Sequence, residues 1–242
     1  MKTIGMIGGM SWESTLDYYR YLNEGVKQKL GGMHSARCLL YSVDFEEIER
    51  YQHHGQWELA TAIMVDAAQR LERGGADFLI ICTNTMHKMA PEVQNSIGIP
   101  LLHIVDAVAK AICDSGIHKV GLLGTRFTME EEFYRGRLEK LHGLEVLVPN
   151  AEERAIVHDV IYKELCLGRI ENQSRLQYKK IITNLVSQGA QGIILGCTEI
   201  GMLIKPEDSP IPLFDTTRLH AQLAVDYALG LITDTFFTAF VS

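Results

Sequence analysis

The two halves of this 242-residue chain carry the same succession of motifs. In the first half an apolar run ends at Gly8-Gly9, and a later apolar run ends at Cys82-Thr83-Asn84-Thr85. In the second half Gly124 ends the first run and Gly196-Cys197-Thr198-Glu199 ends the later one. Because the spacing between the two runs is nearly the same in both halves, we interpret the chain as a tandem duplication of one βα unit.

Short apolar runs alternate with longer amphipathic stretches, which is the pattern of parallel βα units. Strands are predicted at residues 3–7, 37–43, 77–82, 100–103, 119–123, 144–148, 191–195 and 211–213. Helices are predicted at residues 14–29, 56–74, 105–115, 129–141, 152–167, 172–188 and 217–232. Ser11 and Thr125 mark two helix N-termini, and Thr128 with Glu131 fits a capping box.

The predicted fold class is α/β, with two similar parallel-sheet domains. Ser115-Gly116 closes a helix just before the second copy begins, and the last predicted helix is extra to the repeat. We therefore expect a first domain of residues 1–115 plus 217–242 and a second of residues 116–216. Strand ends of two copies that face each other could act on one ligand from opposite sides, so we expect the active site in the cleft between the domains.

The composition is that of a globular protein that does not bind polyanions. Hydrophobic residues make up 47% of the chain and charged residues 22%, which excludes disorder. A formal charge of −7 without a run of five like charges argues against nucleic acid or an anionic membrane as a partner. The chain shows no signal-peptide pattern near its start and no run of 18 apolar residues, so we expect a cytoplasmic protein.

The glycines after the first strand of each copy do not predict a nucleotide site, because their spacing misses both common phosphate-binding motifs. We prefer a small anionic ligand. Gly8-Gly9, Met10 and Ser11 would let the backbone approach a carboxylate at a helix N-terminus. A tight turn that needs a positive φ is the alternative explanation.

Cys197 is the strongest candidate for chemistry. A thiol at a strand end, beside Gly196 and before a helix N-terminus, can have a lowered pKa and be partly thiolate near neutral pH. The five cysteines form no CxxC pair and are odd in number, so we treat them as free thiols. Cys38 and Cys113 are expected to be inert packing residues.

Rival chemistries have weaker support. Cys82, Cys197, His87 and Glu199 could gather around a metal, but no pair among them has the spacing of a zinc site. A serine hydrolase would need a G-x-S-x-G motif, which is missing. His87, His103 and His158 are either local acids or structural histidines, and no lysine is marked as a pyridoxal anchor. No feature of the sequence points to a cofactor.

The motifs resemble the cofactor-independent aspartate/glutamate racemases across essentially the whole chain. The resemblance is carried by Gly8-Gly9-Met10-Ser11, by Thr83-Asn84-Thr85-Met86-His87 and by Gly196-Cys197-Thr198-Glu199-Ile200, in the expected order. It implies two similar α/β domains, no cofactor, and an amino acid as the small-molecule partner. It also implies an acid/base residue from each domain on either side of the α-carbon.

The resemblance assigns roles to particular residues. Cys197 is the second-domain acid/base, and it faces the α-hydrogen of the L-enantiomer. Asn84 and Thr85, together with Thr198 and Glu199, hold the carboxylate and ammonium groups of the amino acid. Further substrate contacts are expected from Met10, Ser11 and Gln52.

This chain departs from the family pattern at the first acid/base position. The family's first motif reads Cys-Asn-Thr, so Thr83 stands where a cysteine is expected and Cys82 comes one residue early. A shift of one residue on a strand reverses the direction of the side chain, so Cys82 should point away from the ligand. A threonine hydroxyl can deliver a proton but is a poor base. We therefore expect Thr83 to oppose Cys197 and L-substrates to be favoured.

A second departure concerns the substrate's side chain. Many aspartate-acting members of the family carry a lysine at the position that Cys166 occupies in this chain. Lys163 or Arg126 would have to substitute if the substrate is acidic.

We predict an isomerase, namely a pyridoxal-independent amino-acid racemase that acts on aspartate or glutamate. Two alternatives stay open: a related isomerase or decarboxylase of a dicarboxylate that needs one cysteine, and a non-catalytic carboxylate-binding protein. A homodimer is one assembly that the chain could form.

Overall fold

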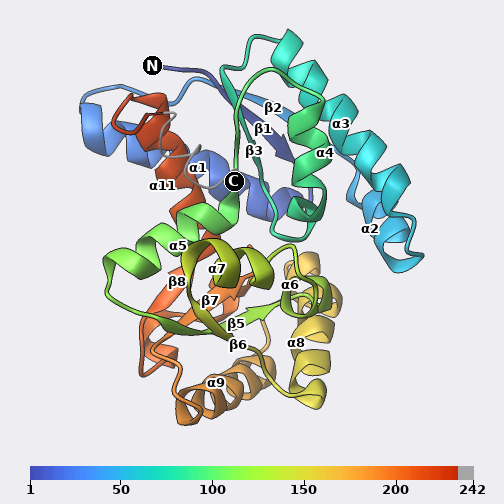
Figure 1. The fold of residues 1–242 in the computed structure, drawn as a ribbon, viewed down its shortest axis with the longest axis vertical. Helices are drawn as coiled ribbons and strands as arrows, with labels where there is room; N and C mark the ends of the chain where they lie inside the picture. Colours follow the sequence, from blue (N-terminus) through green and yellow to red (C-terminus); the bar gives the residue numbers. More distant parts are fainter. Residues whose placement is uncertain (234–242) are drawn as a thin grey trace. The chain divides into compact units, whose positions relative to one another are not determined.

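Eight parallel strands, four in each of two sheets, organise the computed structural model, which describes residues 1–233 (Figure 1). Unit 1 comprises Met1–Ile104 and the chain from His220 onward, and unit 2 comprises Val105–Leu219. The part of the predicted first domain at residues 234–242 lies outside the described residues. The domain limits inferred from the repeat stay a prediction.

The two sheets have the same strand order. The strands of unit 1 are β1 (Ile4–Gly8), β2 (Cys38–Ser42), β3 (Phe78–Ile81) and β4 (Leu101–Leu102), in the order β2-β1-β3-β4. Those of unit 2 are β5 (Lys119–Gly124), β6 (Glu145–Leu147), β7 (Gly192–Gly196) and β8 (Leu213–Asp215), in the order β6-β5-β7-β8. Every pairing is parallel. The predicted fold class of two similar parallel α/β sheets is confirmed.

Helices connect the strands. In unit 1 and at its boundary they are α1 (Trp12–Leu30), α2 (Phe45–His53), α3 (Trp57–Arg73), the 3-10 helix η1 (Thr85–Met89), α4 (Ala90–Asn95) and α5 (Ile104–Asp114). Further along are α6 (Arg126–Glu130), α7 (Arg135–His142), α8 (Ala151–Lys163), η2 (Leu165–Leu167), α9 (Asn172–Ser187), α10 (Ile200–Leu203), η3 (Pro206–Asp208) and α11 (Thr216–Ala228).

The single helix predicted at residues 129–141 is wrong. The chain forms α6 and α7 instead, because Glu131 is extended, with φ −93° and ψ 152°. Thr125 caps α6, and its hydroxyl accepts the N–H of Thr128 at 3.3 Å. The predicted N-terminus at Thr125 is confirmed, and the predicted capping box of Thr128 with Glu131 is wrong.

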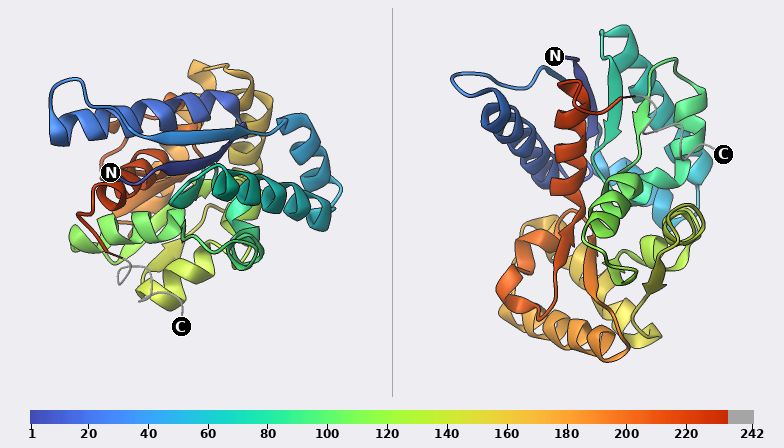
Figure 2. Two further views of the ribbon diagram at one scale, coloured as in Figure 1. Left: turned by 90° about the horizontal axis from the view of Figure 1, so that it is seen from above. Right: turned by 60° about the vertical axis from the view of Figure 1, so that its left-hand side comes forward.

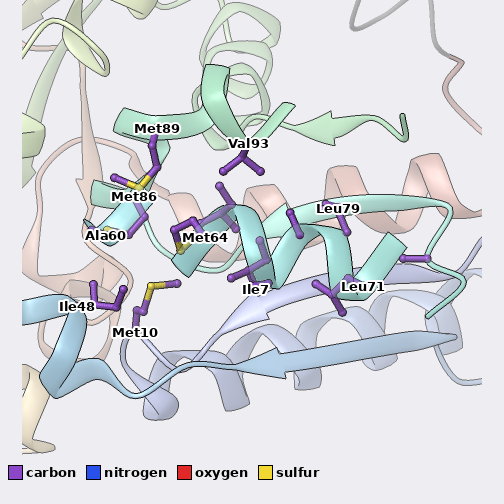
Figure 3. Packing of buried hydrophobic residues seen from close by; sticks show 14 residues of the cluster. Ile7, Met10, Ile48, Ala60, Met64, Leu71, Leu79, Met86, Met89 and Val93 are labelled. Carbon is purple, nitrogen blue, oxygen red and sulfur yellow. The ribbon is translucent and has the colours of Figure 1, made fainter. Parts of the chain in front are cut away.

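The core of unit 1 lies between α3 and the sheet. Apolar residues on α3 recur at helical spacing, as at Ala60, Met64 and Leu71, and so form one buried face. This face packs on strand residues such as Ile7 and Leu79 (Figure 3). Burial of such aliphatic side chains stabilises the fold by roughly 1.5–3 kcal/mol each.

The last helix contributes to unit 1 from His220 onward. The N–H of Lys2 donates to the carbonyl of Ala228 at 2.9 Å. The rings of Phe78 and Tyr227 meet edge to face with centroids 4.9 Å apart. Figures 1 and 2 show α1 and α11 on one side of the first sheet and α3 on the other. The sheet of unit 1 is therefore covered on both faces, as a parallel sheet requires.

A buried ion cluster joins α5 to α7 in unit 2. Arg137 donates through Nε and one terminal nitrogen to the two carboxylate oxygens of Asp106, each at 2.8 Å. His142 Nε2 lies 3.0 Å from Asp106 Oδ1. Burial alone would raise the pKa of Asp106, but the hydrogen bonds from His142 and Arg137 outweigh it, so the pKa of that carboxyl is lowered.

We expect Asp106→Asn to destabilise the protein at pH 7 by about 3 kcal/mol, because Arg137 and His142 lose a buried anion. A lowered pKa in the folded state means that this stabilisation is present above the ordinary pKa and is lost as the pH falls through the folded-state value. Urea unfolding of parent and variant should therefore differ at pH 7 and converge in acid. The exposed pair of Lys163 and Asp159 supplies the control, since Asp159→Asn should change nothing measurable. Equal effects of both substitutions would contradict the assignment.

Candidate active site

The turn after β1 is explained by its own backbone. Gly9 has φ +92°, and a Cβ there would collide with the carbonyl oxygen of Val43. Its N–H donates to Thr15 Oγ1 at 2.9 Å. Ser11 caps α1, as predicted, and its hydroxyl accepts the N–H of Ser14 at 3.3 Å. The need for a positive φ therefore accounts for Gly9, and the N–H groups of Gly9 and Ser14 are both bonded within the chain.

Met10 and Gln52 lie at the same end of the unit 1 core. The Met10 side chain is buried beside Ile48, and Met86 lies at the same end of the cluster (Figure 3). The amide nitrogen of Gln52 donates to Met86 Sδ at 3.1 Å. Gln52 lies on α2, a helix that the sequence analysis does not predict. Asp44 caps this helix by accepting the N–H of Glu46, so an aspartate before residue 45 is the signal that could have revealed it.

The strand register shows which residues of the two copies correspond. Ile7 pairs with Ile81 in unit 1, and Leu123 pairs with Leu195 in unit 2. Ile7 and Leu123 are both the last residue but one of their strands. Thr83 lies two residues after Ile81, and Cys197 lies two residues after Leu195. Thr83 and Cys197 are therefore at equivalent positions of the two copies.

Cys82 belongs to the core of unit 1. Its side chain is fully buried, and its N–H continues the sheet ladder by donating to the carbonyl of Ile7 at 2.9 Å. Burial, with a smaller contribution from Cys38, raises the pKa of the Cys82 thiol far above its ordinary value. Thr83, in contrast, is only half-buried. Of these two neighbours, Thr83 is the one with solvent exposure.

The rest of the first motif is buried. Asn84 precedes η1, and Thr85 is its first residue. His87 Nδ1 lies 2.8 Å from the carbonyl oxygen of Thr83, and the N–H of Ile104 donates to His87 Nε2 at 3.2 Å. Both ring nitrogens of His87 are thus bonded to backbone groups, which supports the structural alternative for this histidine.

Two glycines let the central strands of unit 2 approach each other below the second motif. A Cβ at Gly124 would lie 2.8 Å from the carbonyl oxygen of Gly196, and one at Gly196 would lie 2.8 Å from that of Leu123. Real Cβ atoms do not approach a carbonyl oxygen so closely. The glycine before Cys197 is therefore required by the packing of β5 against β7.

The second motif forms a hydrogen-bonded triad. Cys197 Sγ donates to Glu199 Oε2 at 2.9 Å, and Thr198 Oγ1 donates to the same oxygen at 2.7 Å. All three residues are buried, with Cys197 8% exposed. One carboxylate oxygen of Glu199 therefore accepts hydrogen bonds from both the thiol and the hydroxyl.

The lowered pKa expected for Cys197 is wrong. Burial, followed by the charge of Glu199 and the neighbouring thiol of Cys166, raises the pKa of Cys197 well above its usual value. The helix that follows, α10, has only four residues and so carries little dipole. The Cys197 thiol is therefore protonated and donates its proton to the Glu199 carboxylate.

The two candidate cations for an acidic side chain lie in solvent. Lys163 pairs with Asp159 on the surface of α8, with Nζ 2.8 Å from a carboxylate oxygen. Arg126 is exposed, and its backbone N–H donates to His158 Nδ1 at 3.2 Å. Neither side chain is bonded within the second motif.

Among residues 1–233, no three His, Cys, Asp or Glu side chains are grouped so that they could hold a metal ion. No helix in the same range combines the length and the apolar character needed to cross a membrane.

Comparison with known proteins identifies the class of enzyme. The sequence profile of the Asp/Glu/hydantoin racemases matches residues 7–224. The broad-specificity amino-acid racemase RacX of Bacillus subtilis is 25% identical over 235 residues, which cover 94% of this chain and 98% of RacX. The chain therefore belongs to the Asp/Glu/hydantoin racemase family and is an isomerase, an amino-acid racemase that does not depend on pyridoxal phosphate.

Solved structures agree with this assignment. A Yersinia pestis protein described as a candidate Asp/Glu racemase is 54% identical, with a TM-score of 0.88, and the match covers 95% of this chain and all of that one. An aspartate racemase homologue from Pyrococcus horikoshii is 38% identical, with a TM-score of 0.82 and the same coverage.

Proposed function

We propose that this racemase acts on aspartate or glutamate, with Cys197 and Thr83 as opposed acid/base residues. The register supports this pairing, because it places the two side chains at equivalent strand ends of the two copies. Cys197 removes the α-proton of the L-enantiomer, and Thr83 delivers a proton to the opposite face. The L-enantiomer is favoured because a thiol is a far better base than a hydroxyl.

The proposed mechanism rests on the hydrogen bond from Cys197 to Glu199. Burial raises the pKa of the Cys197 thiol, and the charge of Glu199 raises it further, so the thiol is protonated. A substrate ammonium group bound at Glu199 would neutralise that charge and place a cation near Sγ, and both changes lower the pKa of the thiol. The base thus becomes active when an amino acid binds.

The substrate's carboxylate is held by neutral donors. Asn84 and Thr85 offer an amide and a hydroxyl group, and both are buried, whereas Thr198 already donates its hydroxyl proton to Glu199 Oε2 at 2.7 Å. Such pre-positioned donors stabilise the negative charge that develops when the α-proton leaves. Ser11 and Gln52 add further contacts, and Met10 contributes through its backbone, because its thioether lies in the core.

One alternative reaction is favoured by a specific observation. Only one of the two equivalent strand-end positions carries a thiol, and Cys82 is too deeply buried to replace it. A reaction that needs one cysteine, such as isomerisation or decarboxylation of a dicarboxylate, fits that arrangement.

Incubation of the protein in D2O with single L-amino acids tests the proposal. We expect deuterium at Cα of L-aspartate and L-glutamate and formation of their D-enantiomers, measured by NMR and chiral chromatography. Neutral L-amino acids should react more slowly, and an unsaturated dicarboxylate should stay unchanged. Conversion of the dicarboxylate without any Cα exchange would favour the one-cysteine reaction, and binding without either reaction would favour a non-catalytic protein.

A further inference from the structure

The imidazole of His87 hydrogen-bonds to the backbone of two residues. One is Thr83, the proposed acid/base residue of unit 1, and the other is Ile104. The ring's Nδ1 lies 2.8 Å from the carbonyl oxygen of Thr83, four residues earlier. Its Nε2 accepts the N–H of Ile104 at 3.2 Å. The ring is 1% exposed, so water does not compete for either bond.

The two partners determine the protonation state of the ring. A backbone carbonyl can only accept and a backbone N–H can only donate. Nδ1 must therefore carry the proton, and Nε2 must be bare. His87 is thus a neutral imidazole in a single tautomer, because a proton on Nε2 would face the N–H of Ile104.

The bond to Thr83 fixes the peptide plane that follows this residue. That plane sets ψ of Thr83, and so constrains the direction of its Cα–Cβ bond relative to the following residues. Displacement of a catalytic group by about 1 Å can cost roughly 10²-fold in rate. We propose that His87 is a positioning residue for Thr83, which it holds through the Nδ1–H bond to the Thr83 carbonyl. The inference rests on the proposed function.

The surroundings of His87 provide a matched control. The rings of His103 and His220 lie 4.6 and 5.7 Å from the His87 ring, measured between centroids. The hydroxyl of Tyr18 lies 2.9 Å from His220 Nδ1, and His220 Nε2 lies 2.9 Å from the carbonyl oxygen of Leu102. Tyr18→Phe therefore removes a buried hydrogen bond from the same cluster without touching the backbone of Thr83.

The readout is the ratio of inversion to exchange for an L-substrate in D2O. Exchange with retention needs only Cys197, since this thiol can remove the proton and return a deuteron. Inversion also needs Thr83 to deliver a deuteron to the other face. A general loss of folded protein lowers both rates equally, so the ratio reports on Thr83 alone.

Two substitutions separate the two nitrogens of His87. Asparagine places an amide N–H near the position of Nδ1, whereas glutamine reaches toward that of Nε2. We expect His87→Gln to lower the ratio by about 10-fold or more, because the donor to Thr83 is lost. His87→Asn should keep the ratio within about threefold of the parent, and Tyr18→Phe should lower the melting temperature by a few degrees without changing the ratio. An unchanged ratio in His87→Gln, or an equal fall in Tyr18→Phe, overturns the proposal.

The ring tautomer of the parent protein gives a second measurement that needs no stable variant. Nitrogen NMR of the imidazoles, assigned with His87→Asn, should show a neutral ring protonated on Nδ1 at pH 7. Protonation on Nε2 overturns the proposal. If the parent shows neither exchange nor inversion with any amino acid, the proposed function fails instead, and the tautomer still reports on the hydrogen bonds of His87.

Discussion

Cys197→Ala should abolish both Cα exchange and racemisation, with a fall of about 10⁴-fold or more, because general-base catalysis contributes up to about that factor. Cys82 cannot replace it, because that thiol is fully buried and its pKa is raised. Cys197 lies at a strand end rather than in the middle of the core, so the variant should stay folded and its circular dichroism should match that of the parent. The measurement is deuterium incorporation into L-aspartate and L-glutamate.

Cys82→Ala is the matched control for that experiment. Cys82 comes directly before Thr83, the residue of unit 1 that is equivalent to Cys197. We expect Cys82→Ala to keep the activity and to lose some stability, because the removed thiol lies in the core. Substantial exchange in Cys197→Ala, or loss of exchange in Cys82→Ala, would reverse the assignment of the base.

The second large effect is expected at Thr83. Thr83→Ala should leave exchange of L-substrates by Cys197 intact but slow inversion by about 10²-fold or more, because a positioned proton donor contributes about that much. Thr83→Cys should speed the deprotonation of D-substrates by a similar factor, since a thiol ionises far more readily than a hydroxyl. Both effects are measured by following each enantiomer separately in D2O.

Racemisation has an equilibrium constant of one, so neither Thr83 variant can shift its endpoint. The asymmetry between the enantiomers must therefore appear in kcat and KM together. If Thr83→Ala inverts L-substrates as fast as the parent, Thr83 has no acid/base role, and the one-cysteine reaction becomes the better explanation.

The sheets could be predicted from the sequence, because each strand is a short apolar run with turn residues on both sides. Strand β8 shifted from the predicted 211–213 to Leu213–Asp215. Helices of one or two turns, such as α4 and α10, were missed because hydrophobic periodicity needs a window of about 11 residues or more. The break between α6 and α7 was missed because Glu131 is compatible with a helix and only its tertiary context makes it extended.

The candidate residues could be named from the sequence, but their protonation could not. Whether Cys197 faces a helix dipole or a carboxylate depends on the rotamer of Glu199, and the structure shows the carboxylate 2.9 Å from Sγ. The role of His87 was equally hidden, because its partner Ile104 is distant in sequence. Hydrogen bonds between side chains and distant backbone groups leave no local pattern.

The division of unit 1 into two segments has a consequence for synthesis on the ribosome. His220, Val225 and Tyr227 complete the core of unit 1 against Tyr18, Gly25 and Phe78. Between Ile104 and His220 the ribosome must add the whole of unit 2. At about 5–20 residues per second this takes roughly 6–23 s, a long time on the scale of domain folding. Unit 2 can thus reach its native state first. The first segment of unit 1, Met1–Ile104, stays incompletely packed until α11 has been synthesised.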